Sequence, residues 1–541
     1  MSPLPSRKVA PRALLTRILD EPNLVAAVQA LPAPALGKLI DHVGLEDAGE
    51  IVALATTLQL KRIFDDDLWR SERPGKDETF DANRFALWLE VMLEAGEAFA
   101  AEKLAELPED LVTLALHKHV LVINIEELAL AMADRMSDDD ELTEKALESC
   151  LCEELDEYRI ISRNHEGWDA ILTVLLALDR DHHDFLGRVL QHCCHMAADF
   201  IEENGGLYQV LTSDEMLESD VGAEREERRA EEGFIAPSSA ASFLALARTT
   251  DLADILATEE RDPVTHAYFR SLRAPSHPSA AHDGAQMRVG TDAAKAASLV
   301  EILRDADVLP ASGPSLLLQG APHADEASAQ ESGVFTQAMR RLGAHAVDLH
   351  GRRMQELAYL ANVLAAGSSI EGRTLRPFEA AHLAVATCNL GMEHLLQDEP
   401  GQNPTASLLQ RKSADKLFRI GWRLLGQDVV LAAARAFENA LIREARTTSN
   451  RERAKALEQG TRALRAAIAA GKPWTSLRKL AELEGEVDAT TLTTLVALLD
   501  ECPSLRGRLA PVSEDAPTKQ EARFIATCEQ LRSVQTFLAK L

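Results

Sequence analysis

Apolar side chains recur every three or four residues along most of this chain, and this period limits the folds that the chain can adopt. Side chains at such a spacing lie on one face of an α-helix. β-branched alternation is scarce, and aromatic residues make up only 4% of the composition, so extended strands are poorly supported. We therefore predict an all-α, multi-helical protein, a superhelical or solenoid-like array of two or three helical units.

The length of the chain indicates more than one globular unit. At 541 residues it is about three times as long as a typical domain, which leaves ample material for a hydrophobic core. Residues 271–293 are rich in Pro, Ser, Ala, His and Gly without periodicity and are predicted to be a linker. The other predicted segments are an N-terminal helical array (1–135), a central helical domain with an acidic helix (136–270), a helical domain (294–400) and a basic C-terminal helical domain (401–541).

Several segments around the centre of the chain are assigned to helices by the same period. Residues 107–136 are predicted to form two helices, and residues 146–160 and 165–179 are each predicted to form one. An irregular stretch later in the chain offers a place for one short strand at 315–319.

The charge of the chain is large, negative and unevenly distributed. The net charge is −29 and the pI is near 5.0, which disfavours a general binder of nucleic acid or of membrane surfaces, because an acidic surface repels both. Residues 401–541 nevertheless carry 22 Lys and Arg against 16 Asp and Glu, and residues 411–480 carry 16 against six. A solvated face is the simplest explanation of these cations. If they form a binding surface, the chain's own acidic half or an acidic partner is the first ligand to consider, and RNA is the next.

The cysteines do not form the pattern of a disulfide framework. They are few, odd in number and partly adjacent, which suits a reducing cytoplasm, and this is where we expect the protein to act. The N-terminal residues have no apolar run of signal-peptide length, and no stretch of about 18 apolar residues predicts a membrane span. The cysteines are Cys150, Cys152, Cys193, Cys194, Cys388, Cys502 and Cys528.

The segment 181–204 combines histidines, cysteines and carboxylates on one predicted helix. Its apolar face consists of Phe185, Val189, Cys193, Met196 and Phe200. Beside this face lies a second stripe with His192, His195 and Asp199, at i, i+3 and i+7, and Glu203 at its end. Imidazole and carboxylate groups on one stripe could bind a divalent metal with ligands from elsewhere. The alternative is that the histidines lie on a solvated stripe and that the cysteines pack as small buried side chains.

Common enzyme signatures are missing from the sequence. It contains no GxGxxG after a strand, no GxxxxGK[ST], no GxSxG and no HExxH. The favoured hypothesis is therefore a non-enzymatic interaction or regulatory scaffold that binds a protein partner or a second copy of itself. A metal-dependent enzyme or metal sensor using the stripe at 192–203 is the first alternative, and RNA association through 411–480 is the second. No organic cofactor is predicted.

Five sequence motifs carry a resemblance to a family. They are FDDDLWR (64–70), RRAEEGFIAPSSAASFL (228–244), ELAYLANVLAAG (356–367), CNLGMEHLL (388–396) and LFRIGWRLL (417–425). In this order they resemble an uncharacterised bacterial family of large helical proteins, which implies a helical fold and names no catalytic residue. Residues 21–70 resemble the helical N-terminal superhelix of MgtE-type magnesium transporters, without that family's membrane helices. This second resemblance implies a stack of helices and nothing about magnesium.

Overall fold

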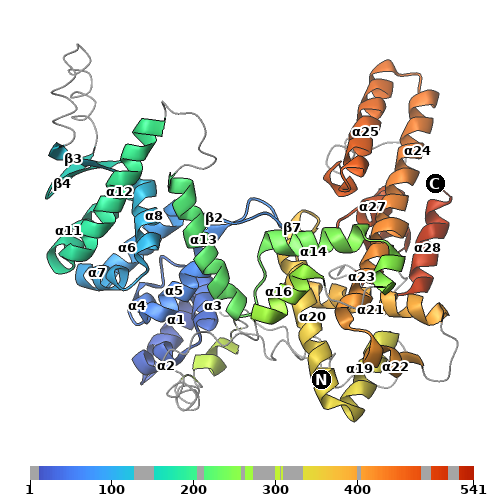
Figure 1. Cartoon of the computed structure of the whole chain (residues 1–541), viewed down its shortest axis with the longest axis horizontal. Helices are drawn as coiled ribbons and strands as arrows, with labels where there is room; N and C mark the ends of the chain where they lie inside the picture. The colour runs from blue at the N-terminus through green and yellow to red at the C-terminus, as the bar shows by residue number, and fades with distance from the viewer. Residues whose placement is uncertain are drawn as a thin grey trace. The chain divides into compact units, whose positions relative to one another are not determined.

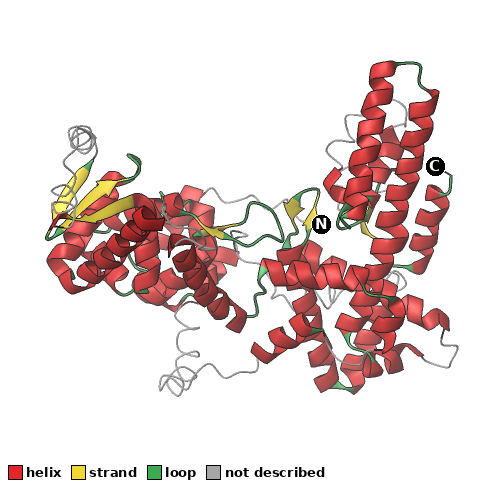
Figure 2. Ribbon diagram, turned by 45° about the horizontal axis from the view of Figure 1, so that its top comes forward, coloured by secondary structure: helices red, strands yellow, loops and turns green. Residues whose placement is uncertain are grey.

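The structure is a computed structural model that consists of two compact units. It describes residues 11–126, 151–203, 213–257, 262–271, parts of 296–308, 333–398, 404–476, 489–509 and 523–540. Unit 1 is formed by residues 1–70, 78–229 and 275–311, and unit 2 by residues 71–77, 230–274 and 312–541. The chain therefore passes between the units several times. Helices dominate both units, and the strands form only small sheets (Figures 1 and 2).

Unit 1 is a set of short helices followed by a small sheet and longer helices. Its helices are α1 (Pro11–Leu19), α2 (Leu24–Ala30), α3 (Ala33–Val43), α4 (Gly49–Val52), α5 (Thr57–Asp67), α6 (Ala82–Glu94), α7 (Glu97–Ala105), α8 (Glu109–His119), α11 (Trp168–Asp181), α12 (His183–Glu203) and α13 (Ser213–Glu231). The last two residues of α13 belong to unit 2. Its strands are β1 (Trp69–Arg70), β2 (Thr79–Phe80), β3 (Val120–Asn124), β4 (Cys152–Leu155) and β5 (Tyr158–Ser162).

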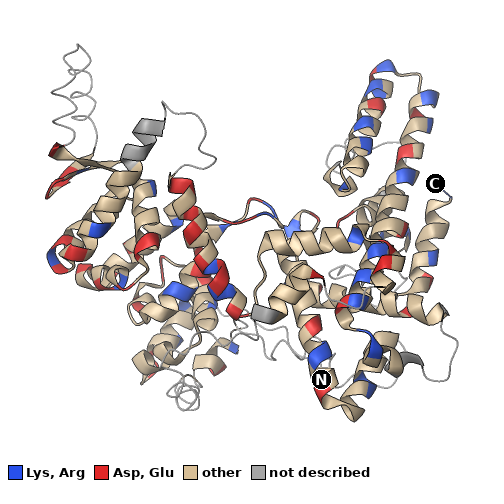
Figure 3. Cartoon of the chain, viewed as in Figure 1, with Lys and Arg blue, Asp and Glu red and all other residues tan. Residues whose placement is uncertain are grey.

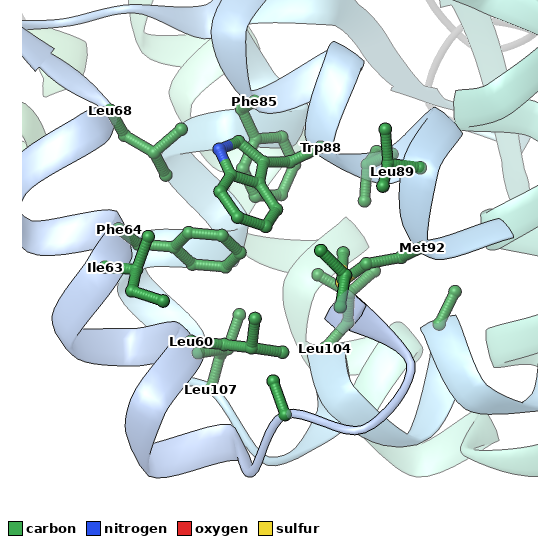
Figure 4. Packing of buried hydrophobic residues seen from close by; sticks show 14 of the residues in the cluster. Leu60, Ile63, Phe64, Leu68, Phe85, Trp88, Leu89, Met92, Leu104 and Leu107 are labelled. Atoms are coloured by element: carbon green, nitrogen blue, oxygen red, sulfur yellow. The ribbon is translucent and has the colours of Figure 1, made fainter. Parts of the chain in front are cut away.

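An aromatic cluster holds α5 and α6 together in the core of unit 1. The rings of Phe64 and Trp88 meet edge to face with their centroids 5.0 Å apart, and Phe85 packs against Phe64 at 6.4 Å. All three side chains are buried, and leucines surround them (Figure 4). The first turn of α5 is fixed by a capping box, in which the Thr56 hydroxyl accepts from the backbone N–H of Gln59 and the Gln59 side chain accepts in return. Packing and capping together define this helix pair.

Helices were predicted for residues 107–136 and 146–160, and this prediction is wrong where the structure forms three short strands. Helix α8 ends at His119, and β3 follows at once; β5 pairs antiparallel with both β3 and β4. Val120 and Val122 are buried and Leu121 between them is half-buried, the alternation of a strand with one covered face. Asp156, with φ of 51°, supports the tight turn between β4 and β5. The β-branched run VLVIN thus overrides the helical period.

Unit 2 is built from longer helices. They are α14 (Pro237–Thr249), α15 (Leu252–Ala257), α16 (Pro263–Ser271), α19 (Val334–His345), α20 (Val347–Gly367), α21 (Pro377–Asp398), α22 (Pro404–Arg411), α23 (Ala414–Leu424), α24 (Ala432–Thr447), α25 (Arg451–Ala469), α27 (Ala489–Leu498) and α28 (Cys528–Leu538). A π-helical segment, η1 (Leu425–Leu431), joins α23 to α24, and η2 (Pro473–Ser476) and η4 (Gly507–Leu509) are 3₁₀ turns. Strands β6 (Ser369–Ile370) and β7 (Arg373–Thr374) pair with each other, as do β8 (Ser504–Leu505) and β9 (Arg523–Phe524).

Helices α21 and α23 cross at two glycines, one from each helix. A Cβ atom at Gly391 would lie 2.0 Å from the carbonyl oxygen of Leu417, and one at Gly421 would lie 2.0 Å from that of Thr387. Any larger residue would force the two backbones apart. The motifs CNLGMEHLL and LFRIGWRLL are therefore the two sides of one close helix crossing.

The helical fold prediction is confirmed in both units, since helices make up most of the described residues. The predicted linker at 271–293 and the strand at 315–319 lie outside the described part, apart from Ser271 at the end of α16. Among the described residues, no single helix has the length and hydropathy to cross a membrane. Only α2 and α3 taken together reach these values, and they are bent by 116° at the break between them.

Candidate functional site

Helix α12 contains the predicted metal stripe and packs through the apolar face beside it. Val189 and Cys193 are buried as predicted, Leu186 and Leu190 join them, and Phe185 is half-buried. Phe200 lies beyond the side chains that the structure describes. The Cys193 thiol lies 3.7 Å from the carbonyl oxygen of Thr113, to which it donates. Burial raises the pKa of Cys193 to about 12, so this thiol stays protonated and is no nucleophile at neutral pH.

The predicted stripe is exposed where the structure describes it. His192 and His195 both face solvent. Nδ1 of His192 lies 3.8 Å from Oε1 of Glu109 on α8, and the Arg188 guanidinium donates to the other oxygen of the same carboxylate at 2.8 Å. The side chains of Asp199 and Glu203 lie outside the described part. The four-residue metal set thus remains a prediction, and Glu109 is a neighbour that the sequence did not indicate.

A different histidine of α12 meets two carboxylates. Nδ1 of His183 lies 2.9 Å from Oδ1 of Asp179 at the end of α11, and Nε2 lies 3.7 Å from Oδ2 of Asp156 in the β4–β5 turn. Among the described residues, these three form a group whose ligand atoms all lie within 4.8 Å of one another. The hydrogen bond that the His183 ring donates to Asp179, followed by the charge of Asp156, raises the pKa of His183. Asp156 and His183 are exposed and Asp179 is half-buried. Carboxylates and an imidazole are ligand types that divalent metals use.

Sequence reasoning missed this group for a local reason. Asp179 and His183 are four residues apart, a spacing that places two side chains next to each other within one helix. In the structure they belong to two helices, since α11 ends at Asp181 and α12 begins at His183. Asp156 gave no signal, because it lies in the strand pair that the sequence period assigns to a helix. Because residues 146–160 were predicted to form a helix, Asp156 was not recognised as the third member of the group.

Two further histidines, His117 and His119 on α8, are buried in unit 1. Burial, together with the nearby charge of Arg163, lowers the pKa of His117 to about 4. Burial also lowers the pKa of His119, whose Nε2 lies 2.8 Å from the carbonyl oxygen of Ala82. Both rings are therefore neutral at pH 7 and belong to the packing of α8.

The three aspartates of FDDDLWR each meet an arginine. Arg228 on α13 makes a two-pronged pair with Asp65 at 2.7 and 3.0 Å. Arg229 lies 3.4 Å from Asp66. Asp67 accepts two bonds from Arg84 at 2.7 and 3.1 Å, and the Trp88 indole donates to it at 2.6 Å. We call this set of ion pairs, with Arg225 and Glu78, the buried ion network.

Arg225 is the most deeply buried cation of the buried ion network. Its side chain is 3% exposed, its guanidinium stacks over the ring of Trp69 at 4.9 Å and pairs with Glu78 at 2.6 Å, and it donates to the carbonyl oxygen of Asp65. Burial lowers the pKa of Arg225. Two motifs about 160 residues apart, FDDDLWR and RRAEEGF, are thus joined by charge pairing, which is a structural role.

The motif residues of unit 2 are also engaged in packing. The Asn362 amide donates to the carbonyl oxygen of Gly233 at 2.8 Å and so links ELAYLANVLAAG to RRAEEGF. Arg353 pairs with Glu356, which accepts from the backbone N–H of Ala414 at the start of α23. Burial raises the pKa of the Cys388 thiol, which donates to the Ala414 carbonyl oxygen. These contacts favour close packing over a nucleophilic role for Cys388.

Two exposed surfaces carry charge of opposite sign. On α13 the arginines turn inward, which leaves Asp220, Glu224 and Glu227 exposed along one stripe; we call these three the acidic ridge. Helices α24 and α25 pack side by side as a hairpin, and Arg451, Lys455 and Arg462 are exposed along α25; we call these three the basic stripe. Figure 3 shows acidic residues along α13 and basic residues along the hairpin.

A comparison with protein families places the chain. Residues 6–287 match the profile described as "Family of unknown function (DUF6178)", which covers just over half of the chain. The chain belongs to this family. The predicted membership of an uncharacterised helical family is thereby confirmed.

The DUF6178 match spans most of unit 1 and stops before the basic hairpin. It includes the whole buried ion network, the acidic ridge and the histidine helix, whereas α24 and α25 lie beyond it. No curated protein and no solved structure matches the chain. The resemblance of residues 21–70 to MgtE-type transporters therefore remains a prediction.

Proposed function

We propose that this DUF6178 protein is a non-enzymatic interaction scaffold that binds an acidic protein surface through the basic stripe on α25. The distribution of side chains on the hairpin supports this proposal, because apolar residues are buried and cations are exposed. Leu457 and Leu464 are buried against α24, whereas the cations of the basic stripe point to solvent. Three exposed cations on one helical face form a surface that attracts carboxylates and rejects other cations.

The pairing of the hairpin's charges supports the same conclusion. Arg465 is paired with Glu438 and Arg453 with Glu444, both between α25 and α24. These pairs join the two helices to each other. The cations of the basic stripe have no ion pair among the described residues within 4 Å, and Glu458 is the one carboxylate that interrupts the stripe. The hairpin therefore presents more positive charge than its own packing uses.

The test is affinity capture with three immobilised full-length proteins. The hairpin-reversed variant carries Arg451→Glu, Lys455→Glu and Arg462→Glu; the control-reversed variant carries Arg340→Glu, Arg341→Glu and Arg352→Glu, at exposed positions of unit 2. We expect a defined protein to be retained by wild type and control from a nuclease-treated lysate, and to be depleted at least about tenfold by hairpin reversal, as the loss of three ion pairs allows. Equal retention by all three proteins would contradict the proposal.

The nuclease step separates this proposal from RNA association through residues 411–480. If the material that distinguishes wild type from the hairpin-reversed variant disappears on nuclease treatment, the ligand of the stripe is nucleic acid and the protein-scaffold proposal is wrong. An RNA ligand would also show a steep dependence of affinity on salt, because phosphate contacts release counterions.

We propose divalent metal binding as a second candidate function, supported by the group of Asp156, Asp179 and His183. Asp179 can hold the His183 ring through Nδ1, as carboxylates orient many histidine ligands, while Nε2 lies 3.7 Å from Oδ2 of Asp156. A metal requires a neutral imidazole, and the pKa of His183 is raised. Affinity should therefore increase with pH.

Calorimetric titration of the full-length protein with Zn²⁺ and with Mn²⁺ tests this candidate. Binding that is lost in His183→Ala and retained in His195→Ala supports the group. Binding that is lost in His195→Ala instead supports the stripe of His192, His195, Asp199 and Glu203. A wild-type protein that binds neither ion contradicts both versions of the metal hypothesis.

A further inference from the structure

The acidic ridge on α13 is opposite in sign to the basic stripe and shares its first spacing. Asp220, Glu224 and Glu227 follow one another at i, i+4 and i+7, the positions of one helical face. Arg451 and Lys455 repeat the first step, and Arg462 extends the stripe to i+11, a length of about 16 Å. The two surfaces thus present opposite charges, over about 10 Å of α13 and about 16 Å of α25, and Glu458 occupies the i+7 position of the stripe.

The ridge is acidic because of how α13 packs. Helix α13 contains eight carboxylates and three arginines, a net charge of −5. All three arginines are drawn toward Asp65, Asp66 and Glu78 by the buried ion network. Within the described part of the chain, Glu224 pairs only with Arg228, at 3.6 Å, and it stays 59% exposed. The fold therefore hides the positive charge of this helix and displays the negative charge.

Each surface also carries apolar atoms beside its charges. Met216, one turn before Asp220 on the same face, is 51% exposed. On α25, Ala466 follows Arg462 by four residues and is exposed. Apolar contact at one end of a row of ion pairs would strengthen a contact that charge alone makes weakly, since exposed ion pairs contribute only about 0.2–1 kcal/mol each.

We infer that the acidic partner of the basic stripe is the acidic ridge of a second copy of this chain. This inference rests on the proposed function and names its partner. Charge complementarity carries it: both surfaces are present on every molecule at equal concentration, and a head-to-tail contact of this kind repeats or closes into a ring. The association is electrostatic, so it weakens as salt screens the charges.

Sedimentation velocity of the full-length protein over a range of concentrations provides the test. Wild type should associate at about 0.05 M salt and dissociate near 1 M, where the screening length is about 3 Å. The hairpin-reversed variant should be monomeric, and so should a ridge-reversed variant with Asp220→Lys and Glu227→Lys. The control-reversed variant should behave as wild type. A wild-type protein that is monomeric at every salt concentration overturns the inference.

A mixture of the hairpin-reversed and ridge-reversed variants controls for folding defects in either variant. Each variant alone carries surfaces of one sign, whereas the mixture again offers a basic and an acidic surface, so an equimolar mixture should associate. A mixture that stays monomeric while wild type associates overturns the pairing of ridge with stripe. The proposed function is decided separately, because depletion of a different protein by hairpin reversal would support it even if wild type were monomeric.

Discussion

Helices α13 and α25 are both amphipathic and rich in arginine, and they use this residue in opposite ways. Arg225 of α13 is almost fully buried, whereas Arg462 of α25 is exposed. The neighbouring helix explains the difference. Helix α5 offers a run of aspartates to α13, while α24 offers Glu438 and Glu444 to Arg465 and Arg453 of α25; among the described residues, no carboxylate lies within 4 Å of the Arg462 guanidinium. The chemistry of the facing element thus decides whether an arginine stabilises the fold or remains available to a partner.

The largest expected effect is the loss of the buried cation on α13. Arg225→Met removes the 2.6 Å partner of Glu78 and a cation that is 3% exposed, while Glu78 keeps Arg229 at 3.0 Å. The cost should therefore lie near the lower end of the about 3–5 kcal/mol for breaking a buried pair. Hydrogen exchange in α5 and α13 should accelerate by at least about a hundredfold, given about 1.4 kcal/mol for each factor of ten. The matched change on α25, Lys455→Met, should alter exchange little. Similar effects in both helices would remove the contrast between them.

The second largest effect is a pH dependence of stability that is expected in α8 of unit 1 and not in the α24–α25 hairpin. The pKa of folded His117 is about 4, below the 6.5 of an unperturbed histidine, so the unfolded chain binds the proton first as pH falls. Unit 1 should lose stability between about pH 6.5 and pH 4, by about 3 kcal/mol at 1.36 kcal/mol for each pKa unit. Hydrogen exchange of α8 at several pH values measures this loss.

The control for the pH effect is available within the same chain. His117→Gln should flatten the pH dependence of exchange in α8, because the titrating group is gone. The α24–α25 hairpin contains no histidine, so its exchange should not follow the same curve. A wild-type α8 whose protection is constant from pH 7 to about pH 4 would show that His117 is not held neutral by burial.

A graded effect is expected along the aspartate run. Asp65→Asn removes the charge from a two-pronged pair whose carboxylate is 6% exposed, and should cost about 2–3 kcal/mol. Asp66 is 51% exposed and makes a single longer contact, so Asp66→Asn should cost less than about 1 kcal/mol. Denaturant unfolding, monitored by hydrogen exchange in α5, ranks the two variants by their free energies of unfolding. The reverse order would contradict the geometry of the buried ion network.

The smallest effect concerns the pairs inside the hairpin. Arg465→Ala removes the ion pair with Glu438 between α25 and α24, and exposed pairs contribute about 0.2–1 kcal/mol. Arg462→Ala removes a cation of the basic stripe and should change stability by less than about 0.5 kcal/mol. Thermal melts of the two variants can be compared directly. If Arg462→Ala were the more destabilising change, Arg462 would belong to the packing of the hairpin.

The sequence predicted the helical fold because the period of three or four is local information. The apolar face of α12 illustrates this, since Val189 and Cys193 are buried as their spacing requires. The same rule failed at Val120–Asn124, where a β-branched run pairs with a strand that is distant in sequence. Pairing with β5 is a long-range contact, and a periodicity of one segment contains no information about it.

The candidate site was less predictable than the fold for a related reason. The stripe with His192 and His195 follows from one helix, but Asp156 joins His183 only through the turn between β4 and β5. The pairing of Asp65 with Arg228 was equally hidden, because α5 and α13 are far apart in sequence. The motifs are visible in the sequence, but their roles as ion pairs and as a glycine crossing follow only from the three-dimensional contacts.

The central claim is that the basic stripe on α25 is a binding surface and not a solvated face. The most direct measurement is quantitative mass spectrometry of proteins retained by wild type, by the hairpin-reversed variant and by the control-reversed variant from the same nuclease-treated lysate. The account predicts at least one protein retained by wild type and control and depleted about tenfold or more by hairpin reversal. Retention that does not differ among the three proteins would contradict it.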